Sequence, residues 1–362
     1  FFFNLDVGFS EKICLFQLKD HPTPDQMFND KYPFFTGSSE AMKSHFKKYA
    51  DFIKKNYIKN NSKIIEIGSN DGTFLNNFKN SNLEYVGFEP SSNVAKIANQ
   101  NKIRTLNQFF GIESLNSVKN FIKQTDVIFA ANVICHIPDL KDLIQSVDLM
   151  LNKNGLFVFE EPYLGSMFEK ISYDQIYDEH IFIFSVTSVS KIFKLFDMEL
   201  VDVLPQTTHG GSIRYIIARK NNHRISNNVN MLLEKEKLRN LDNISSCKEF
   251  KDRCELSKIK TRETLLKFKN KNYKIAGYAA TSKSTTILNY CNINNKVIDY
   301  ICDTTPEKIG KFSPGTHIPI VDMSHFKKFI PDVAYLFAWN HKDEIFKKEK
   351  NYKGKWFSHV TL

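Results

Sequence analysis

The sequence predicts an α/β protein with two sheets, a larger one followed by a smaller one. Between residues 63 and 160, short apolar runs alternate with segments of helical periodicity, which is typical of a parallel sheet covered by helices. Three further apolar runs follow residue 273, after a polar helical stretch at 226–271. A chain of 362 residues is also longer than a single hydrophobic core usually serves.

The first forty-five residues are rich in turn residues and are predicted to be irregular. Residues 41–58 then place apolar side chains on one face of a helix. A short apolar run at 63–68 ends in glycine and is predicted to be a strand, and the polar segment after it is expected to enter a second helix at 71–75. Further strands are predicted at 85–89, 126–131 and 155–160, with an amphipathic helix at 139–151.

The second half of the chain repeats the alternation on a smaller scale. Antiparallel strands are predicted at 198–204 and 212–218, closing the first domain, and the three later apolar runs are expected as strands at 274–278, 297–302 and 332–337. We therefore expect four parts: a lead-in at 1–45, a first α/β domain at 46–222, a helical connector at 223–272 and a C-terminal α/β domain at 273–362.

Composition excludes several classes of protein. With 42% hydrophobic and 25% charged residues, the chain is not disordered, and no apolar run approaches the roughly 20 residues of a membrane helix. The net charge of +10 is scattered rather than clustered, so neither a nucleic-acid nor a membrane partner is expected. Six cysteines without a C-x-x-C pair, and no signal peptide, favour a cytoplasmic protein with free thiols.

The loop Glu66–Gly72 follows the first strand of the sheet. Its glycines allow close backbone approach to a ligand, and Glu89 at the end of the second strand is placed to hold two ribose hydroxyls. Together with Asn132 after the third strand, this pattern favours S-adenosylmethionine (SAM), against a dinucleotide or a purely structural turn. The candidate cofactor-binding residues are Glu66, Gly68, Ser69, Asn70, Asp71, Gly72, Glu89, Pro90 and Asn132.

His136 follows the third strand, at the edge of the sheet where α/β proteins bind ligands. It is interpreted either as a residue facing the methyl-transfer cleft or as a packing residue. The neighbouring Cys135 is expected to be a small packing residue.

Several segments resemble the family of SAM-dependent sugar C-methyltransferases. They run in order from about residue 27 to the C-terminus and include EIGSNDGTFL, NVICHIPDL, DQIYDEHIFIFS, THGGSIRY and WNHKDEI. The resemblance implies a class I, Rossmann-like SAM domain and a C-terminal α/β domain that contributes to binding a nucleotide-linked 4-keto-6-deoxysugar. It implies methyl transfer to C3 of that sugar, in deoxysugar and polysaccharide biosynthesis.

Family members also carry an N-terminal zinc-binding domain with paired cysteines. Here Cys14 matches the last zinc cysteine of the family. Three positions earlier, where the partner cysteine is expected, the sequence has Glu11, and no cysteine lies upstream. One thiolate does not make a tetrahedral zinc site, so no zinc is expected.

The resemblance also assigns the reacting groups. His180 is expected to be the general base, Tyr177 to stabilise the enolate or the substrate, and Glu179 to orient the imidazole. An O- or N-methyltransferase acting on a related activated sugar, with His180 as base, is the alternative. A non-catalytic nucleotide- or nucleic-acid-binding protein is a third interpretation, against which the intact motif argues.

Two further segments are candidates for substrate binding. The double glycine of Thr208–Arg214 permits close approach, although it also fits a β-bulge. The segment Ala280–Thr285 opens a helix, where hydroxyls, free amides and a lysine could hold a diphosphate, although a plain helix cap is equally consistent. The candidate substrate-binding residues are His209, Gly210, Gly211, Arg214, Ser282, Lys283, Ser284 and Asn340.

Overall fold

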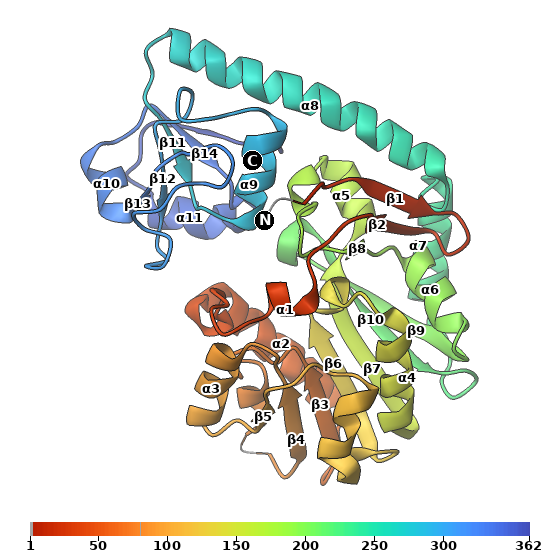
Figure 1. Cartoon of the computed structure of the whole chain (residues 1–362). Helices are drawn as coiled ribbons and strands as arrows, with labels where there is room; N and C mark the ends of the chain where they lie inside the picture. The colour runs from red at the N-terminus through yellow and green to blue at the C-terminus, as the bar shows by residue number, and fades with distance from the viewer. Residues whose placement is uncertain (1–2, 80) are drawn as a thin grey trace. The chain divides into compact units, whose positions relative to one another are not determined.

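The computed structural model describes residues 3–79 and 81–362, and the chain divides into two compact units (Figure 1). The first unit comprises Phe1–Tyr163, Asp178–Gln206 and Ser212–Asp242; the second comprises Leu164–Tyr177, Thr207–Gly211 and Asn243–Leu362. Two short segments that the sequence analysis assigned to the first domain, 164–177 and 207–211, thus group with the second unit.

A seven-stranded sheet forms the first unit, in the order β5-β4-β3-β6-β7-β10-β9. The strands β5, β4, β3, β6 and β7 are parallel, and β10 runs antiparallel between β7 and β9. This confirms the predicted class I methyltransferase arrangement, including the antiparallel closing pair. The bounds are β3 Lys63–Ile67, β4 Glu84–Phe88, β5 Thr105–Leu106, β6 Thr125–Ala131, β7 Leu151–Pro162, β9 Met198–Gln206 and β10 Ser212–Arg219.

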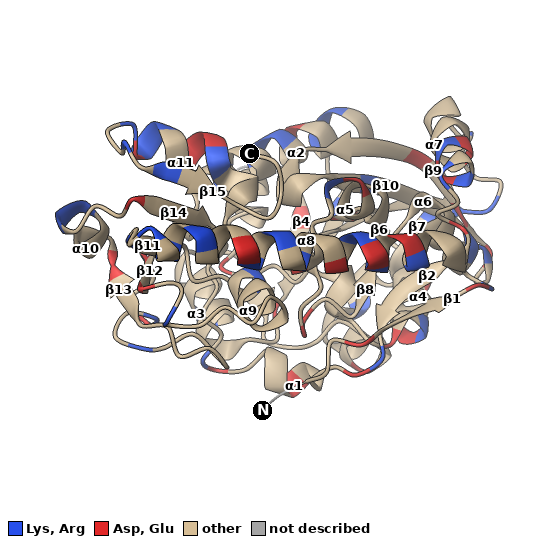
Figure 2. Ribbon diagram, turned by 90° about the horizontal axis from the view of Figure 1, so that it is seen from above, with Lys and Arg blue, Asp and Glu red and all other residues tan. Residues whose placement is uncertain are grey.

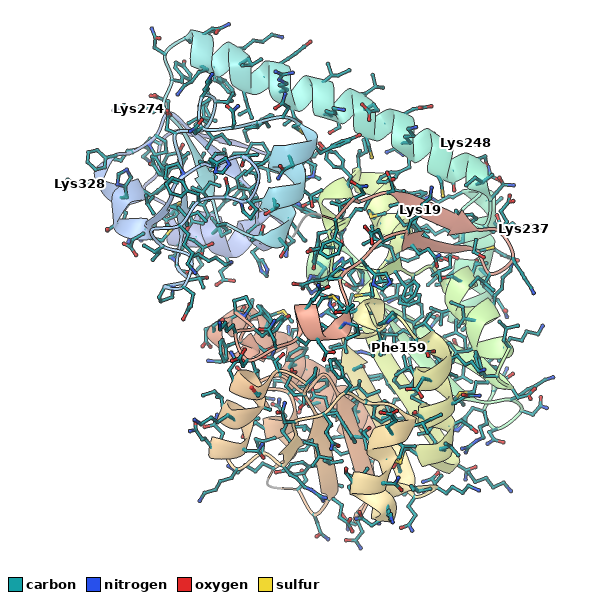
Figure 3. The ribbon with its side chains drawn as sticks, in the orientation of Figure 1. Lys19, Phe159, Lys237, Lys248, Lys274 and Lys328 are labelled. Atoms are coloured by element: carbon teal, nitrogen blue, oxygen red, sulfur yellow. The ribbon has the colours of Figure 1, made fainter. Side chains whose placement is uncertain are left out.

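Alternating side chains of these strands enter two separate cores, one on each face of the sheet. Ile64 packs with α2 (Glu40–Tyr57) in one core, whereas Ile65 packs with α4 (Leu140–Met150) and α6 (Val186–Lys194) in the other. The helices α3 (Ser92–Gln100) and α7 (Asn227–Leu238) complete this unit. Phe159 of β7 lies inside, whereas the labelled Lys19 and Lys237 point outward (Figure 3).

The N-terminal segment is more regular than the sequence analysis expected. β1 (Val7–Ser10) and β2 (Leu15–Leu18) form an antiparallel hairpin, and β2 pairs with β8 (Phe182–Ile183). The short helix α1 (Pro24–Met27) follows. The expectation of an irregular segment was wrong. β2 pairs with a strand about 165 residues away in the sequence, and local sequence patterns do not indicate such a pairing.

The segment after the glycine loop is also different from the expectation. Instead of a long helix, the chain makes turns and a short 3₁₀ helix at Leu75–Phe78. The Asn77 side-chain amide donates to the carbonyls of Thr73 and Phe74, at 3.2 and 2.9 Å. Such side-chain bonds compete with the helical backbone ladder, and the loop therefore presents no long helix N-terminus to a ligand.

The second unit contains a five-stranded, fully parallel sheet, in the order β13-β12-β11-β14-β15. The sequence predicted three of these strands; β13 and β15 are three residues each and carry too short a pattern to detect. The bounds are β11 Ile275–Tyr278, β12 Tyr300–Asp303, β13 Ile320–Asp322, β14 Val333–Leu336 and β15 Lys355–Phe357, with helices α5 Leu164–Lys170, α9 Ser282–Tyr290, α10 Met323–Lys328 and α11 Lys342–Lys348.

The predicted connector is two helices, α7 and the long α8 (Ile244–Asn270). Figure 2 shows acidic and basic residues interspersed along α8. Near its start, Phe250 stacks on Phe168 of α5 with ring centroids 4.2 Å apart. No helix in the described part of the chain combines the length and the apolarity needed to cross a membrane.

Candidate active site

The carboxyl ends of β3, β4, β6 and β7 collect most of the predicted site residues of the first unit. In β3, Ile67 leads directly into Gly68, which has φ +67°. A β-carbon at this position would lie 2.4 Å from Val133 Cγ2. Glycine is therefore required here by the backbone conformation and by the close approach of the loop that follows β6.

The side chains of Asn70 and Asp71 hold a neighbouring segment of the chain. Asn70 Oδ1 accepts from the Thr36 amide at 2.8 Å, and Asp71 Oδ2 accepts from the Gly37 amide at 2.7 Å. The sequence assigned both side chains to cofactor binding. In the structure both side chains instead hold residues 36–37 against the glycine loop.

Glu89 is buried directly after β4. Its carboxylate accepts from the amides of Asn70 and Ser91, at 3.0 and 2.7 Å, and burial raises its pKa. Each carboxylate oxygen can accept a second hydrogen bond, so Glu89 retains capacity for hydroxyl donors. The adjacent Pro90 carbonyl is occupied by the Asn107 amide at 2.7 Å.

Several buried polar atoms at the same edge lack a hydrogen-bond partner within residues 3–79 and 81–362, and three of them are in or near the glycine loop. These three are Glu66 Oε2, Ser69 Oγ and Asn132 Oδ1. Burial raises the pKa of Glu66, and Asn132 has φ +57°. Buried polar groups are rarely left unpaired. Three of them beside one glycine loop fit a polar ligand that supplies donors, such as the ammonium and hydroxyl groups of SAM.

Two histidines lie together after β6 and before β8. The rings of His136 and His180 have centroids 5.2 Å apart, and both side chains are buried. His136 Nδ1 lies 2.5 Å from the backbone carbonyl oxygen of Glu179, and burial lowers its pKa. The Glu179 residue therefore orients His136 through its backbone, whereas the sequence analysis expected its side chain to orient His180.

The Glu179 carboxyl group titrates close to physiological pH. Burial and the neighbouring Asp178 raise its pKa to about 7. Tyr177 belongs to the second unit and Asp178 to the first, so the motif 174–180 crosses the division between the two units.

Tyr32 is a site residue that the sequence analysis missed. Burial, together with the carboxylates of Glu179 and Glu89, raises its pKa well above the ordinary value. Its ring centroid lies 5.4 Å from that of Phe28. In the sequence it stands in a turn-like Lys-Tyr-Pro, which gives no sign that it lies near these acids.

The sequence analysis also did not single out Glu161, because its partners lie in the loop after β6 and not in its own strand. Its Oε1 accepts from the amides of Val133 and Ile134, at 2.9 and 2.6 Å, and it thereby anchors the loop that carries His136. Burial raises its pKa.

Arg214 has partners other than the sugar or phosphate expected from the sequence. Its Nε donates to Glu160 Oε1 at 2.7 Å, and its guanidinium lies 3.7 Å from the centroid of the Tyr49 ring. His45 Nε2 contacts the other oxygen of Glu160 at 2.5 Å. Arg214 thus belongs to a buried charge network, a role that the polar motif alone did not indicate.

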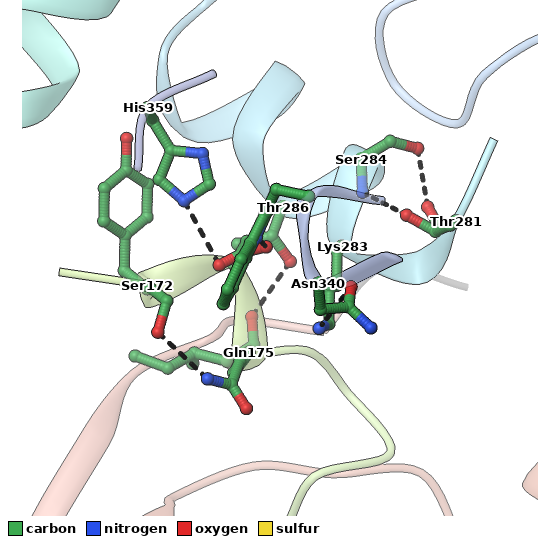
Figure 4. A network of polar contacts seen from close by, with 12 residues as sticks. Ser172, Gln175, Thr281, Lys283, Ser284, Thr286, Asn340 and His359 are labelled. Atoms are coloured by element: carbon green, nitrogen blue, oxygen red, sulfur yellow. Dashed lines mark hydrogen bonds and ion pairs between the residues drawn. The ribbon is translucent and has the colours of Figure 1, made fainter. Parts of the chain in front are cut away.

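In the second unit, the start of α9 holds the candidates from the segment 280–285. The Thr281 side chain accepts from the Ser284 amide at 3.1 Å, and the Ser284 hydroxyl donates to the Thr281 carbonyl at 2.6 Å (Figure 4). This is an N-cap, with Ser282 at the first helical position. The cap, rather than a ligand, satisfies these groups.

Lys283 is buried instead of standing at the surface as a counter-charge. Its Nζ lies 3.4 Å from Asn340 Oδ1 and 5.1 Å from the centroid of the Trp339 ring, and burial lowers its pKa. Lys283 and Asn340 are therefore together, as expected of two parts of one site (Figure 4).

Asp174 forms an unexpected centre in this unit. It accepts from Trp339 Nε1 at 2.6 Å, and its other oxygen lies 3.2 Å from His359 Nε2. Burial alone would raise its pKa, but His359, Lys283 and the Trp339 N–H lower it. The Thr286 hydroxyl also donates to the Ile176 carbonyl at 2.9 Å, so the residues before Tyr177 are held by the second unit.

The double glycine packs tightly within the second unit. His209 has φ +53° within a 3₁₀ turn, Thr208–Gly210, and not in a β-bulge. A β-carbon on Gly210 would lie 2.2 Å from the Trp339 ring, and one on Gly211 would lie 2.4 Å from Ser166 Oγ. Both glycines are thus explained by packing, whatever their role in substrate binding.

Cys14 lies in the core of the first unit. Its Sγ donates to the Asp242 carbonyl at 3.3 Å, and Lys191 Nζ lies 2.9 Å away. The absence of an N-terminal zinc site was inferred from the isolation of Cys14 in the sequence, and it stays a prediction.

Two protein families match the chain in succession. Residues 42–203 match the family described as "Methyltransferase domain", and residues 207–360 match "C-methyltransferase C-terminal domain". Among characterised proteins, the C-methyltransferase NovU of Streptomyces niveus is 28% identical over 352 residues, which cover 97% of this chain and 84% of NovU. The two matches and the similarity to NovU support SAM-dependent C-methyltransferase activity.

Two further similar proteins each cover less than half of this C-methyltransferase. A carboxy-S-adenosyl-L-methionine synthase of Nautilia profundicola is 30% identical over 164 residues, 42% of this chain and 64% of the synthase. A solved SAM-dependent methyltransferase from Clostridium acetobutylicum has a TM-score of 0.37 and 14% identity, covering 49% of this chain and 92% of that one. The predicted cofactor, SAM, agrees with the family.

Proposed function

We propose that this C-methyltransferase transfers a methyl group from SAM to C3 of a nucleotide-linked 4-keto-6-deoxysugar, in cytoplasmic deoxysugar biosynthesis. The observation that carries the proposal is the pair of buried histidines, His136 and His180, at the sheet edge that also holds Glu66 and Glu89. A base is what carbon methylation needs, because carbon becomes nucleophilic only after a proton is removed.

The chemistry assigns a task to each group. The 4-keto group acidifies the C3 hydrogen, and His180 takes that proton, leaving an enolate whose charge rests on the C4 oxygen. The Tyr177 hydroxyl, by the family resemblance, donates to that oxygen. SAM supplies the electrophilic methyl group, which forms a bond to C3 as its bond to sulfur breaks.

A buried histidine is suited to this task. Burial lowers the pKa of the neighbouring His136 and so favours the neutral ring, which can accept a proton. His136 is the rival base, because the Glu179 carbonyl holds its Nδ1 proton and leaves Nε2 as an acceptor.

We further propose that the second unit binds the nucleotide-sugar, with Lys283 and Asn340 as its polar contacts. Support comes from their pairing and from the burial of the lysine, which lacks a carboxylate within salt-bridge distance among the described residues. Asp174 is near enough to influence the ionisation of Lys283, and a phosphate oxygen would add a negative charge in direct contact with the ammonium group.

Deuterium exchange tests the reaction type. In deuterated buffer, the protein should exchange the C3 hydrogen of a 4-keto sugar nucleotide, which an O- or N-methyltransferase has no reason to do. His180→Asn should slow exchange by roughly 10²–10⁴-fold, the contribution of a general base, and leave SAM binding intact. His223→Asn, on the surface, is the matched control.

The rival assignment is decided by the same measurement. If His136→Asn abolishes exchange while His180→Asn does not, the base is His136 and the roles are reversed. If the wild type binds SAM and the sugar nucleotide but exchanges no C3 hydrogen, carbon methylation through an enolate is wrong.

A further inference from the structure

One cysteine and two histidines meet in the first unit in a way that general-base chemistry does not require. The ligand atoms of Cys135, His136 and His180 all lie within 4.8 Å of one another. Their side chains are enclosed, with exposed fractions of 1%, 9% and 4%. Thiolate and imidazole are the ligands that zinc prefers.

The protonation of His136 favours coordination. A carbonyl oxygen can only accept, so the short contact with Glu179 places the proton on Nδ1. The lone pair is therefore on Nε2. Histidines that bind metals show this arrangement, with one nitrogen on the ion and the other donating to a carbonyl or carboxylate.

A fourth group stands beside these three. Glu161 is fully buried, and Cys135 and His136 are among the groups that influence its ionisation. Its Oε1 holds two backbone amides, whereas its Oε2 has no hydrogen-bond partner in the part of the chain that the structure describes. An unpaired carboxylate oxygen next to a cysteine and a histidine is suited to a cation.

We propose that Cys135, His136 and His180 bind one thiophilic divalent cation, zinc in particular, and that its binding inhibits the enzyme. The cation takes the lone pair of the proposed base and displaces the thiol proton of Cys135. The inhibition rests on the proposed function, whereas the binding does not. This exchangeable site is distinct from the N-terminal structural zinc that Cys14 alone does not support.

The cluster must contract slightly to hold the ion. Zn–S and Zn–N bonds of about 2.3 and 2.0–2.1 Å place tetrahedral ligand atoms about 3.3–3.7 Å apart. The observed upper limit of 4.8 Å therefore requires shifts of roughly 1 Å, which side-chain rotation supplies.

Cobalt provides a direct test of binding, since Co²⁺ takes the same ligands and is coloured. Metal-free protein titrated with Co²⁺ should show a one-to-one complex with a thiolate-to-cobalt charge-transfer band. Cys135→Ala should lose the band and weaken binding by at least about 100-fold, because even removal of an outer partner costs roughly 10–100-fold. Cys247→Ala, which removes the most exposed cysteine, should keep it.

Activity distinguishes the two proposals. Zinc should inhibit wild-type turnover, and a chelator should restore it. The turnover of Cys135→Ala should be little changed by zinc, relative to the metal-free rate of the same variant. A band that persists in Cys135→Ala, or no tight complex with the wild type, overturns the site. A band in the wild type without inhibition by zinc leaves the site standing and shows that His180 and His136 do not supply the base.

Discussion

Glu89 combines two functions in one side chain. It fixes the backbone of the glycine loop through Asn70 and Ser91, and its remaining acceptor capacity is assigned to the ribose of SAM. Glu89→Ala should weaken SAM binding by of order 1–3 kcal/mol, about 5- to 150-fold, because hydroxyl donors lose a buried acceptor. Isothermal calorimetry measures this.

The control for this prediction lies on the same strand. Glu84 begins β4 and is exposed, with Asn120 as a partner at 3.0 Å. Glu84→Ala should leave SAM affinity unchanged. Equal affinities for the wild type and Glu89→Ala would remove Glu89 from the cofactor site.

Arg214 and Arg219 offer a comparison of buried and accessible ion pairs on one strand. The side chains of Arg214 and Glu160 are 6% and 1% exposed, whereas those of Arg219 and Asp148 are 28% and 46% exposed. Arg214→Met should cost about 3–5 kcal/mol of unfolding free energy, since it leaves a buried carboxylate without its cation. Arg219→Met should cost less, because water reaches Asp148. Urea unfolding followed by circular dichroism gives both values; similar costs would contradict the argument.

Residue types indicated the candidate cofactor-binding residues in the loops after β3 and β4, but not the residues that surround them. Glycine at 68 and an acid at 89 are required by chemistry that is local in sequence. By contrast, the acids that influence Tyr32 lie 57 and 147 residues away in the sequence. Glu161 binds the backbone of the loop that follows β6. Nothing in the adjacent sequence encodes those distances.

At the scale of elements, the glycine loop leaves little room for substitution. Gly68→Ala imposes a strained φ and also drives a β-carbon into Val133. Gly310 has φ +80°, and no atom lies within 4 Å of the position that its β-carbon would take, so this residue isolates the backbone cost. Gly310→Ala should cost about 1–2 kcal/mol, and Gly68→Ala should cost more and weaken SAM binding.

Thermal unfolding with and without SAM measures both glycine variants. Equal losses of stability, with SAM affinity retained in Gly68→Ala, would mean that the loop after β6 yields to the added methyl group.

Periodicity predicted the long elements and the four-residue strands β11, β12 and β14, but it missed other short strands. The strands β3, β4, β6 and β7 and the helices α2 and α4 lie within a few residues of their predicted bounds, because burial on both faces leaves continuous apolar runs. β1, β2, β13 and β15 are three or four residues long and depend on distant partners. At the helix expected at 71–75, the Asn77 side chain instead bonds the carbonyls of Thr73 and Phe74 and competes with the helical backbone bonds.

At the scale of the whole molecule, both tryptophans, Trp339 and Trp356, lie in the second unit. Tryptophan fluorescence therefore follows the unfolding of that unit. The pKa of Asp174 is lowered from 3.8 in the folded state, so its ionised form contributes stability above that value. The contribution is lost as the pH falls through the folded pKa.

Asp174→Asn should accordingly flatten the pH dependence of unfolding below about pH 5, measured by tryptophan fluorescence in denaturant. Its stability at pH 7 should be lower than that of the wild type, because the buried Lys283 loses a nearby negative charge. Asp252→Asn, on an exposed position of α8 in the same unit, is the control. An unchanged acid limb in Asp174→Asn would show that other carboxyl groups govern the unfolding.

The chain passes between its two units five times, after residues 163, 177, 206, 211 and 242. Cutting at 242 would therefore not release an intact second unit: the fragment 243–362 lacks Asp174, to which Trp339 and His359 bind. The two units are consequently not interchangeable cassettes. A chimera that exchanged only the C-terminal third would take Trp339 and His359 from one parent and Asp174 from the other. If the second unit binds the substrate, as we propose, substrate preference should be transferred only when residues 164–177 and 207–211 are exchanged as well.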